Sequence, residues 1–240
     1  MPGHTDEVWK TSSVVAVYLQ GVRAAIPLAQ EQIDIMLRLL AALGQPIRSF
    51  LDLGSGDGVL AAAILDRYPG AEGVLVDFSG PMIEAARNRF AHQNASVRFV
   101  NADYGPASWT GSVEKWGPYD AIVSGYSIHH QPDTRKRGIY AELFRLLRPG
   151  GIFINVEHVA SASGWVASVH DDLFIDHLCH GRPGTSRAEI AETYYHRPDK
   201  EANILAPVEL QCQWLREIGF ADVDCYLKVF ELAVFGGRRP

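Results

Sequence analysis

The sequence has few cysteines and no long apolar run. It contains 240 residues with three cysteines, Cys179, Cys212 and Cys225, which form no CxxC pair. This usage excludes a disulfide-rich scaffold and is typical of reduced thiols in a cytosolic protein. The N-terminus carries acids and lacks an apolar core segment, and no uncharged apolar stretch reaches about eighteen residues. We therefore expect a cytoplasmic protein with neither a secretory signal nor a membrane span.

Positive charge is also scarce. Lys and Arg together number 22 against 28 Asp and Glu, a formal net charge of −6. Binding to a phosphate backbone requires clustered cations, so nucleic acid is disfavoured as a partner. The basic cluster around 135–137 is expected to be a solvated helix face. A hydrophobic fraction of 47% with 21% charged residues indicates a packed globular chain.

Short apolar runs alternate with amphipathic segments along most of the chain. The first five apolar runs are 49–54, 73–78, 97–103, 120–126 and 151–158. Near-continuous apolar strands separated by helices are typical of a parallel sheet covered on both faces. The last two runs, 222–230 and 231–239, have almost no spacer, so they must pair antiparallel. We predict an α/β fold with a mostly parallel sheet and one reversed strand.

Two segments flank or interrupt this alternation. Residues 1–45 have apolar positions at helical spacing, which Pro27 should divide, and are expected to form an N-terminal helical cap. Residues 46–240 are expected to form the main domain. Within it, residues 159–206 make a long insertion of the kind that usually forms a lid or binding element.

The strongest local motif is Leu-Asp-Leu-Gly-Ser-Gly-Asp-Gly at 51–58, between a predicted strand and an alanine-rich helix. Its glycines allow a sharp turn and a close approach of backbone to a ligand. Asp77 ends the next strand, where a carboxylate can accept both hydroxyls of a ribose. Asp103 ends a third strand, where it could accept from an adenine amino group. Alone, the glycine motif is compatible with a dinucleotide site or with several nucleoside sites, and a tight turn that binds nothing is the alternative.

The spacing and charge of this motif favour one class of ligand. The loop is GxGxG and not GxGxxG, and Asp52 precedes its first glycine by two residues. A carboxylate there would repel a diphosphate and attract a cation. With Asp57, Asp77 and Asp103, we expect four acids in the cleft and no phosphate-binding Lys or Arg. An adenine nucleoside bearing positive charge, such as S-adenosylmethionine, fits this pattern.

From about residue 45 to its end the chain resembles the class I S-adenosylmethionine-dependent methyltransferases. The resemblance depends on DLGSGDG, VDFSGPMIEAAR, NAD, YDAIVSGYSIHH, LLRPGGIFINVEHV and the closing strand pair. It implies a Rossmann-like seven-stranded sheet, with S-adenosylhomocysteine as the product of the cofactor. It also implies a set of cofactor-binding positions: Asp52, Gly54, Ser55 and Gly56 at the methionine moiety, Asp77 at the ribose, Phe78 and Met82 beside the adenine, Asp103 and Tyr104 at its amino edge, and Ser124 and Gly125 beneath the sulfonium.

Histidines and a glutamate follow the fourth and fifth predicted strands, on the edge that faces the cofactor. His129 and His130 are candidates for a general base, since a histidine pKa near 6.5 suits that role at neutral pH. The alternative is that they cap the following helix. Glu157 and His158 could assist deprotonation and line the acceptor pocket, or they could be a satisfied polar pair beneath the lid.

The insertion and the N-terminal segment supply candidates for binding a methyl acceptor. Aromatic and cationic side chains suit a small organic molecule, and we expect Tyr18, Trp165, Tyr195 and Arg197 to contact it. Packing of the lid is the alternative role for the aromatics. His177 and His180 lie one helical turn apart, but no second pair completes a metal site. We therefore predict no metal, with a divalent ion shared with His129 or His158 as the alternative.

These observations predict an S-adenosylmethionine-dependent methyltransferase that acts on oxygen or nitrogen of a small metabolite, as a monomer or homodimer. A tRNA, rRNA or protein methyltransferase of the same fold is the first alternative. A non-catalytic nucleoside-binding regulator is the second. A nicotinamide dehydrogenase is the third, and the GxGxG spacing disfavours it.

Overall fold

A seven-stranded sheet in the order β3-β2-β1-β4-β5-β7-β6 forms the centre of the computed structural model, which describes residues 5–19, 25–93, 95–197, 200 and 202–240. The strands are β1 (Ser49–Leu53), β2 (Glu72–Asp77), β3 (Ser96–Asn101), β4 (Tyr119–Gly125), β5 (Leu147–His158), β6 (Ala221–Val229) and β7 (Leu232–Arg238). β7 pairs antiparallel with both β5 and β6, and the other neighbours pair parallel. The predicted Rossmann-like sheet with one reversed strand is confirmed.

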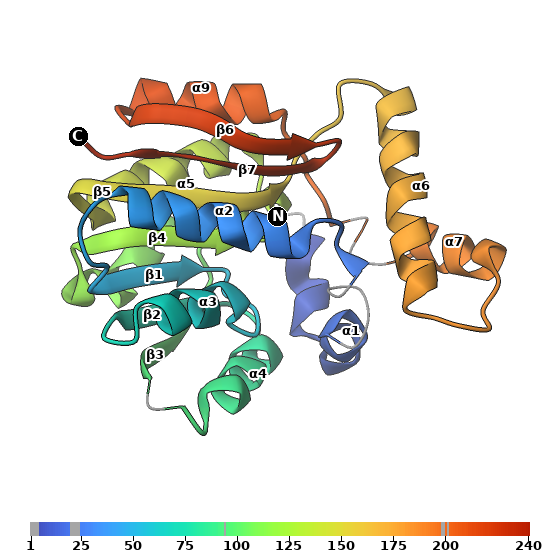
Figure 1. Ribbon diagram of the computed structural model, residues 1–240, viewed down its shortest axis with the longest axis horizontal. Coiled ribbons are helices and arrows are strands. Elements are labelled where there is room, and N and C mark those ends of the chain that lie inside the picture. The colour runs from blue at the N-terminus through green and yellow to red at the C-terminus, as the bar shows by residue number, and fades with distance from the viewer. Residues whose placement is uncertain (1–4, 20–24, 94, 198–199, 201) are drawn as a thin grey trace.

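Helices cover both faces of this sheet (Figure 1). One face is covered by α2 (Ala29–Ala42), α3 (Val59–Arg67) and α4 (Gly80–Phe90), whose apolar residues share a core with Phe50 and Leu75. The other face is covered by η4 (Ala107–Ser112), η5 (Glu114–Trp116), α5 (Asp133–Leu146) and α9 (Val208–Ile218). Two packed layers of helix around a buried sheet explain why the strands are apolar on both sides.

Local sequence signals account for where these helices begin and end. The Ser79 hydroxyl accepts a hydrogen bond from the backbone N–H of Met82 at 3.3 Å and caps α4. α9 follows Pro207 and ends at Gly219, whose φ of 115° is accessible to glycine at little cost. The helices that begin and end at these residues lie on the faces of the sheet, and other elements cover the edge where the parallel strands end.

The remaining elements gather at that edge. They are η1 (Thr5–Lys10), α1 (Ser12–Val17), η6 (Ile128–His130), α6 (Gly164–His180) and α7 (Arg187–Tyr195). In Figure 1, α6 and α7 stand beyond the carboxyl ends of the strands, and a separate apolar cluster joins Ala25 to Phe174 and Tyr194. Parts of the predicted cap (1–4 and 20–24) and insertion (198–199 and 201) lie outside the described residues. The domain boundaries themselves stay a prediction.

The expected cap divides into two parts. α2 packs on the sheet through Met36 and Leu40, in the same core as α3, whereas η1 and α1 reach the edge where the strands end. None of the described helices is long and apolar enough to cross a membrane.

The basic cluster is only in part the solvated face that we expected from the sequence: Arg137 is exposed, and the other two residues are not. Lys136 is fully buried, and its ammonium donates to Asp133 at 2.7 Å and to the carbonyl of Ile204. Arg135 pairs with Glu142 at 2.6 Å. The expectation was wrong for Lys136, because a long aliphatic stem can be buried when its charged end finds partners in the interior.

Candidate active site

A cavity of about 400 Å³ lies at the carboxyl edge of the sheet, between the strand ends and the insertion. It is lined by residues from the β1–α3 loop, the ends of β2, β4 and β5, the N-terminal segment, α6, and the β6–β7 turn. The structure brings together on its wall most of the residues that we predicted for the site: Tyr18, Gly54, Gly56, Asp77, Phe78, Met82, Gly125, His129, His130, His158 and Arg197.

The glycine loop requires its glycines for two different reasons. Gly54 has a φ of +66°, and a Cβ there would lie 1.8 Å from the Ser127 hydroxyl oxygen. Gly56 has a φ of +53°, and the nearest atom to its Cβ position is the sulfur of Met82 at 3.9 Å. A side chain at Gly56 would therefore occupy space in the cavity, while one at Gly54 would collide with the protein.

The Asp77 carboxylate is held in place by the backbone. The N–H of Gly56 donates to Oδ2 and the N–H of Ser79 donates to Oδ1, both at 2.8 Å. An ionised carboxylate has about four acceptor positions, so two backbone donors leave capacity for ribose hydroxyls. Asp77 lines the cavity, and the loop and the acid expected to bind the nucleoside are thus connected by a hydrogen bond.

Four predicted cofactor residues do not line the cavity. Asp52 is buried and accepts from the N–H of Ala61 at the start of α3, and Ser55 is buried in the loop. Asp103 is exposed and accepts from the N–H of Gly105. The ring of Tyr104 is buried in the core, with its hydroxyl 3.0 Å from the carbonyl oxygen of Ser127.

The expected ring of four acids is consequently wrong. Of the four, only Asp77 lines the cavity, and Asp57 instead forms an ion pair with Arg89. Asp52 and Asp103 accept from backbone N–H groups away from the cavity, and Asp57 accepts from the Arg89 side chain. Two cations also line the cavity: Arg197, which we predicted to contact the acceptor, and Lys200, which we did not predict.

Four further predicted residues also lie off the cavity wall. Ser124 is buried, and its hydroxyl donates to the carbonyl of Leu53 at 2.7 Å. Trp165 and Tyr195 lie on the outside of the insertion with exposed fractions of 76% and 49%. Glu157 is fully buried behind the wall, where it contacts His129 and His158.

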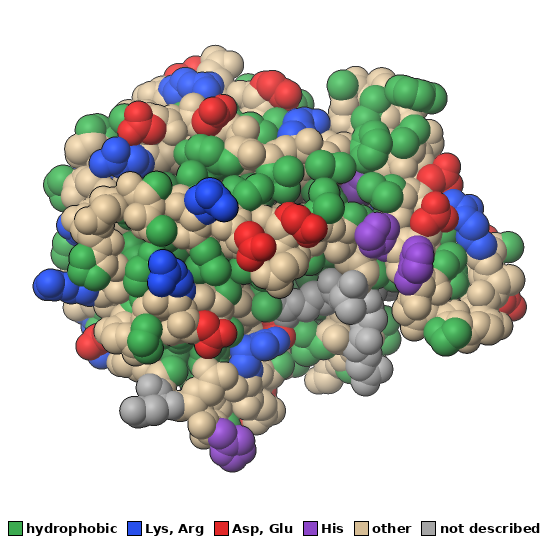
Figure 2. Space-filling model, in the orientation of Figure 1, with side chains coloured by type: hydrophobic (Ala, Val, Ile, Leu, Met, Phe, Trp, Pro, Cys, Tyr) green, Lys and Arg blue, Asp and Glu red, His purple; other side chains and the backbone are tan. Residues whose placement is uncertain are grey.

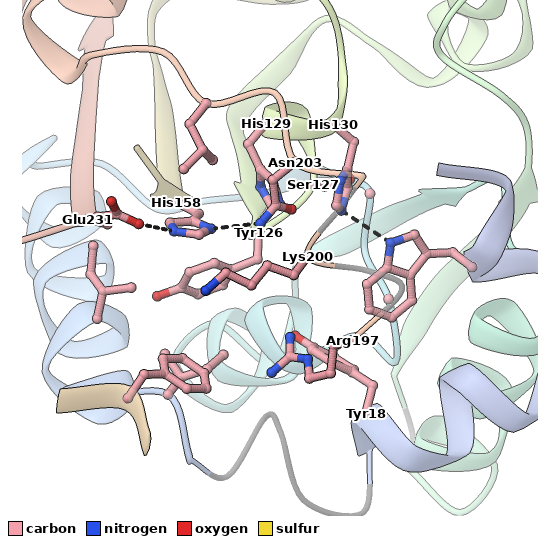
Figure 3. Close-up of a pocket in the computed structure, with 18 of the residues that line it drawn as sticks. Tyr18, Tyr126, Ser127, His129, His130, His158, Arg197, Lys200, Asn203 and Glu231 are labelled. Carbon is pink, nitrogen blue, oxygen red and sulfur yellow. Dashed lines mark hydrogen bonds and ion pairs between the residues drawn. The ribbon is translucent and has the colours of Figure 1, made fainter. Parts of the chain in front are cut away.

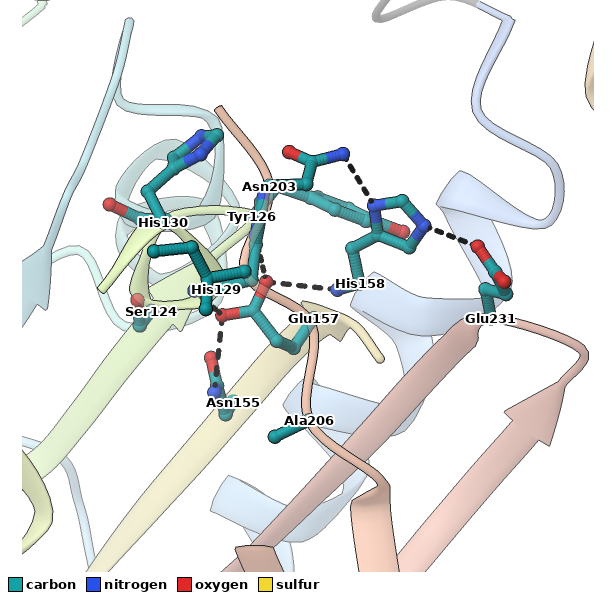
Figure 4. Close-up of polar contacts among 12 residues, drawn as sticks. Ser124, Tyr126, His129, His130, Asn155, Glu157, His158, Asn203, Ala206 and Glu231 are labelled. Atoms are coloured by element: carbon teal, nitrogen blue, oxygen red, sulfur yellow. Dashed lines mark hydrogen bonds and ion pairs between the residues drawn. The ribbon is translucent and has the colours of Figure 1, made fainter. Parts of the chain in front are cut away.

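His129 and Glu157 form a buried pair (Figure 4). Nδ1 of His129 lies 2.6 Å from Oε1 of Glu157, and the backbone N–H of His129 donates to Oε2 at 3.1 Å. The N–H of His158 donates to Oε1 at 2.9 Å. Burial raises the pKa of Glu157 to about 7, against the opposing effects of this backbone hydrogen bond and of nearby His130. When Glu157 is ionised, it accepts from the Nδ1–H of His129 and leaves Nε2 as the basic nitrogen.

His130 is held by two different partners. Nε2 lies 3.2 Å from the indole nitrogen of Trp9, which can only donate, so Nε2 is the acceptor. Nδ1 therefore carries the proton and donates to the carbonyl of Ala202, also at 3.2 Å. The His129 and His130 rings are 4.0 Å apart between centroids. The N-terminal segment thus closes one side of the cavity by binding the second histidine.

The far side of the cavity contains polar residues that sequence reasoning missed. Nε2 of His158 lies 2.8 Å from Oε2 of Glu231, and the Asn203 amide lies 3.4 Å from Nδ1 of His158 (Figure 3). A charged residue in a hairpin turn is ordinarily expected in solvent, so Glu231 was overlooked. The predicted antiparallel strand was the available signal, because such a strand begins at the edge where its parallel neighbour ends.

The insertion supplies further groups to the same wall. Asp171 accepts from the Tyr194 hydroxyl at 2.7 Å and from the Lys200 ammonium at 2.8 Å. The Arg197 guanidinium lies 5.5 Å from the centroid of the Tyr194 ring. Burial is the main cause that lowers the pKa of His170 to about 4, so this ring is neutral at physiological pH. His177 and His180 do not line the cavity.

The residues present fit S-adenosylmethionine. Gly56 provides a cradle that a Cβ would fill, Asp77 provides a carboxylate for a ribose, and Phe78 and Met82 provide apolar surface for a purine. Within the described part of the chain, the buried hydroxyl of Ser55 has no hydrogen-bond partner. When bound, the cofactor supplies a methyl group already activated by positive sulfur, and the site is the donor half of a methyltransferase.

Comparison with known proteins also indicates a methyltransferase. A protein-family model described as "Methyltransferase domain" matches residues 50–151. The chain is 33% identical over 208 residues to a trans-aconitate 2-methyltransferase from Acidovorax sp., covering 76% of this chain and 72% of that protein. It is 21% identical over 224 residues to a carboxy-S-adenosyl-L-methionine synthase from Nautilia profundicola, covering 92% and 90%. The chain belongs to the class I S-adenosylmethionine-dependent methyltransferases.

Solved structures show the same fold. An O-methyltransferase family protein from Burkholderia thailandensis superposes with a TM-score of 0.59 at 16% identity over 90% of this chain. The chain spans 60% of the length of that protein. The expectations of a methyltransferase enzyme and of S-adenosylmethionine as cofactor are confirmed, and the regulator and dehydrogenase alternatives are set aside.

Proposed function

We propose that this methyltransferase acts on oxygen or nitrogen of a small anionic metabolite, with His129 as the general base. One observation carries the proposal: His129 lines the cavity that Gly56 and Asp77 also line, and its Nδ1 is 2.6 Å from the buried Glu157. A carboxylate at Nδ1 orients the ring and stabilises the imidazolium that forms when Nε2 takes a proton.

A general base serves to remove a proton from the methyl acceptor, and the methyl donor does not require one. A hydroxyl or ammonium group must lose a proton to become a nucleophile, whereas the methyl carbon of a sulfonium needs only alignment. His130 is less suited to this role, because Trp9 donates to its Nε2 and its Nδ1–H is directed at a carbonyl. The two predicted histidines are therefore assigned different roles, with His130 holding the N-terminal segment over the site.

Two cations on one wall of the cavity support a small anionic acceptor, although Asp171 pairs with one of them, Lys200, at 2.8 Å. Arg197 and Lys200 line the wall that the insertion contributes. A trans-aconitate methyltransferase, one of the relatives, acts on a small carboxylic acid by its name. On the face shown in Figure 2, Lys and Arg side chains alternate with Asp and Glu and do not gather in one patch. Among the described residues on this face there is thus no basic patch of the kind that binding to an RNA backbone requires.

The test is a metabolite screen with S-adenosylmethionine, read by mass spectrometry as an added methyl group and by release of S-adenosylhomocysteine. With the acceptor found, His129→Asn should lower kcat about 100-fold or more, within the range of general-base catalysis. Its affinity for S-adenosylmethionine by calorimetry should stay within about twofold, because a base contributes to the reaction step.

His92→Ala is the matched control. His92 is exposed after α4 and does not line the cavity, so this variant should turn over at the wild-type rate. Full turnover by His129→Asn would overturn the assignment of the base. Methylation of RNA and of no small molecule would overturn the assignment of the acceptor.

A further inference from the structure

We propose that His158, His170 and Glu231 bind one divalent transition-metal ion on the wall of the cavity. One ligand atom from each residue lies within 4.8 Å of the other two. The three side chains come from the end of β5, from α6 and from the β6–β7 turn. Figure 3 shows His158 and Glu231 directed toward each other at one side of the pocket.

The distances suit a metal after a small adjustment. Oε2 of Glu231 is 2.8 Å from Nε2 of His158 and 3.9 Å from Nε2 of His170. In a tetrahedral zinc site with bonds of about 2.0–2.1 Å, ligand atoms are roughly 3.3 Å apart. Both distances lie within about 0.6 Å of that spacing. Two imidazole nitrogens and one carboxylate oxygen are a donor set that zinc and similar ions prefer.

A hydrogen bond on the side away from the histidines orients the Glu231 carboxylate. The hydroxyl of Ser161 donates to Oε1 of Glu231 at 2.6 Å, which leaves Oε2 facing the two histidines. Hydrogen bonds of this kind orient metal ligands in known sites. Coordination through Nε2 of His158 places its proton on Nδ1, where the Asn203 amide lies at 3.4 Å. A half-turn of that amide would present its oxygen to accept this proton.

His170 is the most buried of the three proposed ligands. The side chain is only 2% exposed and lines the cavity, and its Nδ1 has no hydrogen-bond partner among the described residues. The proposed ion would bind the other nitrogen, Nε2, which lies 3.9 Å from Oε2 of Glu231.

A site with three protein ligands leaves at least one coordination position open. The rings of His158 and His129 are 5.6 Å apart between centroids, and both line the cavity. The open position would therefore face the space where an acceptor oxygen could bind. Only this last step depends on the proposed function, because the ion itself would bind whether or not His129 is the base.

The experiment uses the full chain after treatment with EDTA and dialysis. Zn²⁺ binding is measured by calorimetry, and Co²⁺ binding by the visible absorption of the coordinated ion. The expected result is one ion per chain with a Kd in the micromolar range or below. His170→Ala and Glu231→Gln should each weaken binding about tenfold or more, since loss of even an outer hydrogen bond costs about 10- to 100-fold.

The double variant His177→Ala, His180→Ala is the matched control. Both histidines are on α6 but outside the cavity, so the variant should bind Zn²⁺ like the wild type. Calorimetry with S-adenosylmethionine checks that every variant is folded. The inference is overturned if the wild type binds no stoichiometric ion, or if only the control variant loses binding. Since neither measurement needs an acceptor, a failure here is distinct from a failure of His129 as base.

Discussion

The imidazole of His129 and the carboxylate of Glu157 meet at 2.6 Å although the two residues are 28 positions apart in the sequence. They meet because β4 and β5 are parallel neighbours, so that residues following the two strands emerge at one edge. Glu157 is fully buried, and His129 stands between it and the cavity. A buried acid is thus connected to the cavity by a hydrogen bond to a histidine that lines it.

Replacing the acid without changing its size should reduce catalysis. In Glu157→Gln the His129 ring loses the negative charge that stabilises its protonated form, so kcat should fall about 10- to 100-fold at pH 8. In the wild type kcat should rise through about pH 7, as the Glu157 carboxyl with its raised pKa ionises. The pH–rate profile measured in EDTA checks both expectations. They would be contradicted if kcat of the Glu157→Gln variant rose through about pH 7 as in the wild type.

The stability of the protein should depend on pH through the same group. Burial raises the folded-state pKa of Glu157 from 4.5 to about 7, so between these values the folded state binds more protons than the unfolded state. The free energy of unfolding should fall as pH rises from 5 to 8, by up to about 3 kcal/mol from this residue. Urea denaturation of wild type and Glu157→Gln in EDTA measures it, and the variant should lack this contribution. Parallel pH curves would rule the assignment out.

Asp77 and Asp103 should differ in their effect on cofactor binding. Asp77→Asn removes a charged acceptor on the cavity wall and should raise the Kd for S-adenosylmethionine about 10- to 100-fold. Asp103→Asn changes an exposed carboxylate outside the cavity and should stay within about twofold. Calorimetry with S-adenosylmethionine measures the Kd of both variants. Equal losses would restore Asp103 to the adenine pocket, as the motif alone implied.

The glycine loop should tolerate no side chain at its first glycine. Gly54→Ala combines a φ of +66° with a Cβ placed 1.8 Å from the Ser127 hydroxyl oxygen, and should lower the free energy of unfolding by about 2 kcal/mol or more. Gly80→Ala is the control, because nothing lies within 4 Å of its Cβ position in the first turn of α4. That variant should be neutral or up to about 1 kcal/mol more stable. Chemical denaturation of the two variants provides the comparison.

Arg197 should affect the acceptor and not the cofactor. If the acceptor is anionic, Arg197→Gln removes a cation from the cavity wall and should raise the KM for the acceptor about tenfold or more. Arg187→Gln, which loses only exposed ion pairs to Asp172 and Asp176, should change this KM little. Steady-state kinetics at saturating S-adenosylmethionine measures both. An unchanged KM in the first variant would argue for a neutral acceptor.

Most of the fold followed from the sequence because its strands are apolar on both sides and its helices have clear ends. The short spacer at Phe230 and Glu231 was enough to predict the reversed β7. The glycine loop and Asp77 were also recognisable, since their roles depend on backbone geometry that local sequence dictates.

Side-chain direction was decided only by tertiary contacts. Asp52 and Asp103 belong to the same motifs as Gly54 and Asp77, yet both turn to backbone N–H groups away from the cavity. Glu231 reaches His158 across 73 residues of sequence, by a contact that no local pattern contains. The sequence determined which strands end at one edge, because burial and periodicity are local properties. The tertiary structure decided which polar groups at that edge face inward, because each polar group takes whichever partner the assembled fold brings within hydrogen-bonding distance.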